Sequence, residues 1–96
     1  MQTITPQQRG TLQSIASEAR QTIDGDSPLY AVMFYPSDMN IWQLEVHVWY
    51  TRTQKEEQDM HIAVFALRDK IRAKGIPCDL ELADKGIYQA TYELKP

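Results

Sequence analysis

Glu45, His47 and Glu93 are the residues whose types and spacing could do chemistry. Glu45 and His47 are two positions apart in an apolar run, so they share one face of a predicted strand. Glu93 lies in a second such run near the C-terminus, which could pair with the first. Carboxylate and imidazole groups together suit zinc or another divalent ion. A solvated acidic strand with one histidine has the same spacing, so we expect no metal and no cofactor, and keep these residues as an alternative metal site.

Other templates for catalysis are absent from the sequence. The chain has no glycine-rich phosphate loop, no paired-cysteine zinc motif and no Gly-x-Ser-x-Gly elbow. Cys78 falls on the predicted buried side of a strand, where a thiol packs and does not react. Arg68 and Arg72, with His61 nearby, could hold an anion, but a solvated helix face is the simpler explanation and the one we favour. The sequence favours a protein that is not an enzyme, without deciding the point.

The runs Leu44–Val48 and Cys78–Leu80 place acidic residues between hydrophobic ones in a way that resembles small nucleotidyltransferases. The chain departs from that family after its first predicted strand, where Phe34–Ser37 replaces a Gly-Ser turn that cradles triphosphate. His47 also stands where the family has its second metal-binding carboxylate. The alternative function is therefore a degenerate or small nucleotidyltransferase-like or metal-binding protein that uses Glu45, His47 and a nearby carboxylate.

These residues must be positioned by two helices and four strands. Apolar stripes with helical periodicity predict helices over 6–23 and 54–74. Each helix is preceded by residues with capping-box spacing, Thr5 with Gln8 and Thr53 with Glu56. Alternating apolar residues predict the strands, which cover residues 29–35, 41–51, 78–83 and 87–94.

The order helix-strand-strand-helix-strand-strand predicts an α+β two-layer sandwich. Moving the last strand to the front gives strand-helix-strand twice, so we predict a permuted ferredoxin-like fold with a four-stranded antiparallel sheet and both helices on one face. Right-handed crossovers place strands 41–51 and 87–94 at the sheet centre. The 96 residues form a single domain, built either from two similar halves, 5–48 and 53–96, or from two unrelated units.

Composition excludes several classes of partner. Thirteen acidic residues against ten basic ones give a net charge of −3, and no predicted outward strand position is basic. Nucleic acid would therefore be repelled by the sheet. No apolar run is long enough to span a membrane, and the polar N-terminus does not resemble a secretory signal. With one cysteine and no internal disulfide, the expected location is cytoplasmic.

Exposed apolar residues predict a protein partner. Two of them project from the second helix away from its buried stripe, and the others lie on the open side of the sheet. The predicted interaction surface consists of Leu29, Ala31, Met33, Tyr35, Ile41, Trp49, Ile62 and Phe65. Strand 29–35 also carries no charge, although edge strands normally carry one to prevent pairing. We therefore predict a small non-catalytic interaction domain that self-associates, as a homodimer, through strand 29–35 and the open sheet face; a different protein partner stays open.

Overall fold

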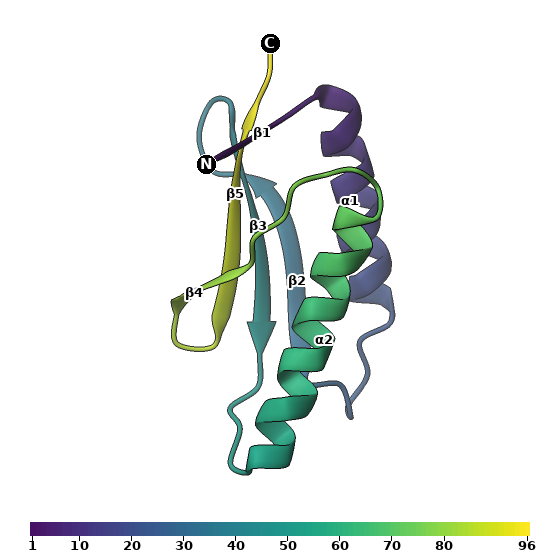
Figure 1. The fold of residues 1–96 in the computed structure, drawn as a ribbon, viewed down its shortest axis with the longest axis vertical. Helices are drawn as coiled ribbons and strands as arrows, with labels where there is room; N and C mark the ends of the chain where they lie inside the picture. The colour runs from purple at the N-terminus through teal and green to yellow at the C-terminus, as the bar shows by residue number, and fades with distance from the viewer.

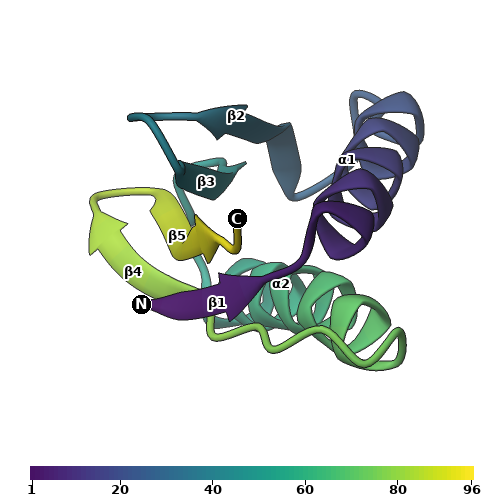
Figure 2. The ribbon, with the colours of Figure 1, turned by 90° about the horizontal axis from the view of Figure 1, so that it is seen from above.

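The computed structural model describes all 96 residues and contains two helices and five strands. In chain order they are β1 (Gln2–Ile4), α1 (Pro6–Gln21), β2 (Leu29–Pro36), β3 (Ile41–Val48), α2 (Gln54–Arg72), β4 (Glu81–Asp84) and β5 (Ile87–Leu94). Both helices lie on one face of the sheet, and the opposite face has no covering layer (Figure 1, Figure 2). The predicted α+β class is confirmed.

Both helices start at the predicted caps. The Thr5 hydroxyl accepts the Gln8 N–H at 3.1 Å, and the Gln8 side chain accepts the Thr5 N–H at 2.9 Å, so this capping box is complete. At α2 the Thr53 hydroxyl accepts the Glu56 N–H at 3.1 Å. The Glu56 carboxylate bonds to that hydroxyl instead of the Thr53 N–H, so only half of the box forms.

The sheet has the order β2-β3-β5, and β1 and β4 both pair with the far side of β5. β3 and β5 are adjacent and antiparallel at the centre, as the sequence predicts. β1, however, pairs parallel with β5, from Gln2 opposite Tyr92 to Ile4 opposite Leu94. The sheet is therefore mixed and five-stranded, and the prediction of four antiparallel strands did not include β1. A strand of three residues is too short to show alternation in the sequence.

The core lies between the helices and the inner face of the sheet, and all 19 of its buried residues are apolar. β3 contributes Leu44 and Val46, and the helices contribute residues such as Leu12 and Val64. Burying one such side chain stabilises the fold by about 1.5–3 kcal/mol. Alternation along β3 and β5 therefore sends one face of each strand inward and leaves the other outward.

A bulge near the start of β2 reverses two predicted orientations. Leu29 pairs with Val48, but Ala31 pairs with His47, so Tyr30 is an extra residue in the strand. Leu29 consequently turns inward and is 9% exposed, while Tyr30 turns outward and is 45% exposed. The prediction that Leu29, named for the interaction surface, faces the open side of the sheet is wrong, because strict alternation cannot reveal a bulge.

β3 and β4 also differ from their predicted bounds. β3 ends at Val48, so Trp49 and Tyr50 follow the strand and are not part of it. β4 begins at Glu81, three residues later than predicted, and a second irregularity separates Leu82 from Asp84. Leu82, predicted to face the core, is 63% exposed.

Candidate functional site

The uncovered face of the sheet, which we call the outer face, holds most of the predicted interaction residues. Ala31 lies opposite His47, Met33 opposite Glu45 and Tyr35 opposite Gln43. These side chains, and that of Ile41, are half-buried by their neighbours in the sheet. Trp49 follows β3 and packs on the exposed ring of Tyr30, with centroids 4.7 Å apart. The bulge thus supplies an aromatic side chain that the sequence did not place here.

A chain of four polar side chains crosses this face, and we call it the outer-face network. The Tyr35 hydroxyl donates to one carboxylate oxygen of Glu45. The other oxygen lies 2.9 Å from His47 Nε2, and His47 Nδ1 lies 3.3 Å from the Tyr30 hydroxyl. Alternation predicted that Glu45 and His47 share a face, and the structure brings them into direct contact. The two tyrosines extend the pair toward β2.

The hydrogen bonds in the outer-face network change two pKa values. Bonds from Tyr35 and His47 lower the pKa of Glu45 below its usual value of 4.5. The bond to Glu45, aided by burial, raises the pKa of the Tyr35 phenol. The network therefore favours a charged Glu45 and a neutral Tyr35. Each Glu45 oxygen therefore already accepts one hydrogen bond within the chain.

Glu93 does not join Glu45 and His47. Glu45 lies opposite Gln89 on β5, whereas Glu93 lies opposite Ile41. Four residues along a strand separate Glu93 from Gln89, a distance of about 13 Å. No three His, Cys, Asp or Glu side chains of the chain are grouped so that they could hold a metal ion. Of the three residues of the alternative metal site, the structure brings Glu45 and His47 together and leaves Glu93 apart.

The two predicted apolar residues of α2 differ in exposure. Ile62 is exposed, as predicted. Phe65 is half-buried and packs against the core. The centroid of its ring lies 5.9 Å from that of the stacked His61 ring and 4.6 Å from the Arg68 guanidinium. Arg72 donates to the Cys78 carbonyl oxygen at 2.8 Å. The cationic residues that could have held an anion are therefore engaged within the chain.

The sequence did not predict an apolar hollow where β3 leads into α2. Trp49, Tyr50 and Leu82 surround a cavity of about 390 Å³, which His61 and Lys85 also line. Tyr50 is 74% exposed and Trp49 is 56% exposed. The alternation of apolar residues predicted a strand that continues through Thr51, and this prediction directed the Tyr50 side chain toward the core. One feature of the sequence could have indicated the hollow. The predicted strand 41–51 is longer than its hairpin partner 29–35, so its last residues would have no partner on that strand.

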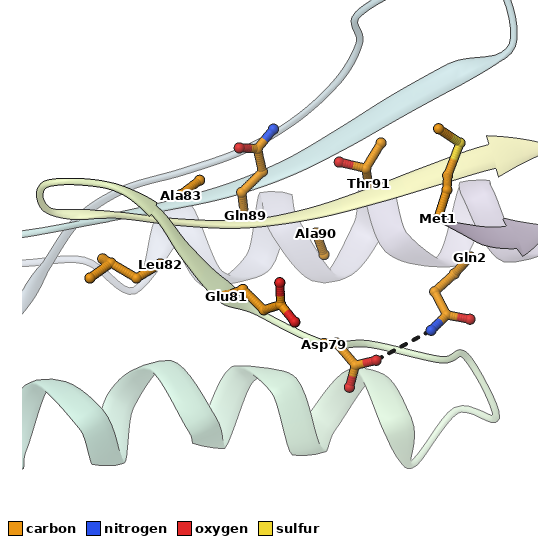
Figure 3. Close-up of a pocket in the computed structure, with 9 residues that line it drawn as sticks. All are labelled: Met1, Gln2, Asp79, Glu81, Leu82, Ala83, Gln89, Ala90 and Thr91. Carbon is orange, nitrogen blue, oxygen red and sulfur yellow. Dashed lines mark hydrogen bonds between the residues drawn. The ribbon is translucent and has the colours of Figure 1, made fainter.

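A second cavity, of about 340 Å³, lies beside β5 between β1 and β4, as Figure 3 shows. Gln2 and Asp79 approach each other across its mouth, with a hydrogen bond of 3.3 Å from the amide to the carboxylate. Cys78, next to Asp79, is buried, and this burial raises the pKa of its thiol. A thiolate nucleophile is disfavoured there, in line with a packing role for Cys78.

Comparison of the chain with protein-family models, curated proteins and solved structures gives no match. No helix is both long and apolar enough to cross a membrane.

Proposed function

We propose that this protein is a small non-catalytic interaction domain that self-associates through β2 and the adjoining outer face. One observation carries the proposal: the outer face has no covering layer (Figure 2). Apolar side chains nevertheless lie along its β2 side. Ala31 and Met33 continue into the stacked pair of Tyr30 and Trp49. A second copy packed on this side would remove their apolar area from water.

The polar residues of the outer face are compatible with such burial. Glu45 accepts hydrogen bonds from Tyr35 and His47, and His47 is also bonded to Tyr30. Covering groups that already have partners costs less than covering an unpaired carboxylate. The outer-face network would therefore add specificity to the interface without leaving a charge unpartnered.

Contacts through the outer face are favoured over pairing along the β2 edge. β2 has β3 on one side and no strand on the other. However, Arg20 Nη1 lies 3.4 Å from the Val32 carbonyl oxygen, and the bulge at Tyr30 interrupts the ladder. Pro36 ends the strand without an N–H donor. A twofold contact centred on Met33 needs none of these backbone groups.

The same proposal retains three finer expectations. The first is a permuted ferredoxin-like arrangement, which the central β3–β5 pair and the position of both helices on one face support. The second is a cytoplasmic location, which the free, buried thiol of Cys78 supports. An origin from two halves is supported by caps 48 residues apart, at Thr5 and Thr53, although β3 and β5 begin only 46 residues apart. The metal-binding or nucleotidyltransferase-like alternative receives less support, because Glu45 and His47 have no third ligand nearby.

Light scattering over a range of concentrations tests the proposal. The wild-type protein should have about twice the mass of its 11.1 kDa chain. Met33→Lys should give a folded monomer, because a charged ammonium group would be buried at the centre of the contact. Gln13→Lys adds the same charge to the exposed side of α1 and should remain dimeric. A monomeric wild-type protein at high micromolar concentration, or a dimeric and folded Met33→Lys variant, would contradict the proposal.

A further inference from the structure

The segment between β3 and α2, residues 49–52, passes between two hollows. Trp49, Tyr50 and Thr51 line both of them. The first is the apolar hollow of about 390 Å³ beside Leu82. The second, of about 240 Å³, has the carboxylates of Asp26, Glu56 and Asp59 in its lining. Two exposed aromatic side chains therefore line both hollows.

The backbone of this segment is largely without partners. Trp49 donates its N–H to the Pro28 carbonyl oxygen at 3.0 Å. The N–H and C=O groups of residues 50–52 make no hydrogen bond within the protein. Free donors and acceptors along a short segment are what an extended peptide pairs with when it binds by its main chain. A small cation would leave the N–H groups unused.

The charges around the hollows are predominantly negative. Asp26, Glu56 and Asp59 line the second hollow, and Glu57 lines the first. Lys85 is the cationic lining residue, and Arg52 and Lys55, which are exposed in and beside the segment, line neither hollow. Two of the carboxylates, in the first turn of α2, also complement the helix dipole. The surface is therefore complementary to a basic partner and would repel an acidic one.

One internal contact shows that Tyr50 can receive a cation. The Lys85 ammonium lies 5.8 Å from the centroid of the Tyr50 ring. An ammonium or guanidinium group over an aromatic face is attracted by the negative potential of the ring. Trp49 and Tyr50 both expose much of their surface, so a cationic group from a partner could contact their rings among the carboxylates.

From these observations we propose that residues 49–52 and the two hollows bind a short, extended, basic segment of a partner protein. An arginine or lysine of that segment lies on the aromatic rings, and its backbone pairs with residues 50–52. An apolar side chain next to the basic one occupies the hollow beside Leu82. This surface shares Trp49 with the proposed self-association surface but does not include Met33. The monomeric Met33→Lys variant should therefore keep it, so the proposal does not depend on self-association.

Titration of the ¹⁵N-labelled protein with two synthetic peptides tests the proposal by NMR. The first is an acetylated hexapeptide with alternating arginine and leucine between terminal glycines, and the second replaces each arginine by citrulline, which is neutral and nearly isosteric. The arginine peptide should shift the amide signals of residues 49–52 and the Trp49 indole signal. The citrulline peptide should bind at least about tenfold more weakly, because both the charge pairing and the cation–π contact are lost.

Three variants define the surface. Tyr50→Ala should weaken binding of the arginine peptide about fivefold, the loss expected for one exposed cation–π contact. Asp59→Asn should weaken it about twofold, because one rim carboxylate is neutralised. Met39→Ala removes an equally exposed apolar side chain in the turn between β2 and β3 and should bind as the wild type does. Met33→Lys should also bind normally.

Any of three results would overturn the proposal. The first is equal binding of the arginine and citrulline peptides. The second is unchanged binding by a folded Tyr50→Ala variant. The third is that the same signals shift with the concentration of the Met33→Lys variant alone, which would identify a second copy as the occupant. Circular dichroism establishes that each variant is folded before it is titrated.

Discussion

The two edges of the sheet are protected in different ways. β2 forms one edge with eight residues and no charged side chain. Its protection comes from the bulge at Tyr30 and from Arg20, which reaches from α1 to the Val32 carbonyl oxygen. At the other edge, β5 is covered by two short strands placed end to end, β1 parallel to it and β4 antiparallel. Acidic residues lie near this second edge, and one of them, Asp79, accepts a hydrogen bond from Arg72.

This difference shows that the protection of an edge is a tertiary property. The uncharged sequence of β2 suggests an edge fully available for pairing, yet one of its carbonyl groups is taken by a residue far away in the chain. The charged sequence near β4 suggests a closed edge, yet a cavity remains between β1 and β4 (Figure 3). Substitutions along the two edges test how each of them is protected.

Ile4→Ala should destabilise the fold most, because it removes the fully buried side chain by which β1 contributes to the core. We expect a loss of about 3 kcal/mol in the free energy of unfolding, measured by urea denaturation. Thr3→Ala, at an exposed position of the same strand, should change it by less than about 0.5 kcal/mol. Equal losses in the two variants would show that β1 is not held by burial of Ile4.

Tyr92→Phe should release the segment that leads into β4. The buried Tyr92 hydroxyl donates to the Pro77 carbonyl oxygen at 2.8 Å, and its loss leaves that carbonyl group without a partner. We expect a loss of about 1–2 kcal/mol in unfolding free energy and faster amide exchange in residues 78–84. Tyr88→Phe is the matched control, because the Tyr88 hydroxyl has no hydrogen bond within the chain, and an equal loss there would contradict this role.

Arg20→Ala should open the edge at β2. Loss of the long bond to Val32 should cost at most about 1 kcal/mol in unfolding free energy. If two copies meet through the outer face, their dissociation constant, measured by analytical ultracentrifugation, should not change. Tighter association of this variant would show that the edge itself pairs. Arg52→Ala removes an exposed arginine without a hydrogen bond and serves as the control for lost charge.

Tyr35→Phe should raise the pKa of Glu45 toward its usual value, because the largest cause of the lowering is removed. In the wild type, the lowered pKa stabilises the folded protein above about pH 4.5, and this contribution disappears as the pH falls through the lowered value. The variant should therefore lose less stability on acidification. Carboxyl ¹³C titration by NMR measures the pKa directly.

Tyr30→Phe provides the control for this titration. Its hydroxyl bonds to His47 and not to Glu45, so the pKa of Glu45 should remain lowered. An unchanged Glu45 pKa in Tyr35→Phe, or an equal change in both variants, would show that the Tyr35 hydroxyl does not set this pKa.

Local chemistry was enough to predict the helices, the hairpins and the inward faces of β3 and β5. Thr5 and Thr53 cap their helices because a hydroxyl at that position satisfies a free N–H group, whatever the rest of the chain does. Gly86 lies at a positive φ of 77° in the turn between β4 and β5, as its place in a short hairpin loop indicates. The contact between Glu45 and His47 also follows from two-residue spacing on one strand.

Only the tertiary structure determined β1, the bulge at Tyr30, the bond from Arg20 and the exit of the chain at Trp49. Each depends on register or on a partner distant in sequence. A one-residue shift exchanges the two faces of a strand, so the bulge moved Leu29 inward and Tyr30 outward. The distance between Glu93 and Glu45 also depends on register, because the pairing of β3 with β5 decides which residues lie opposite each other.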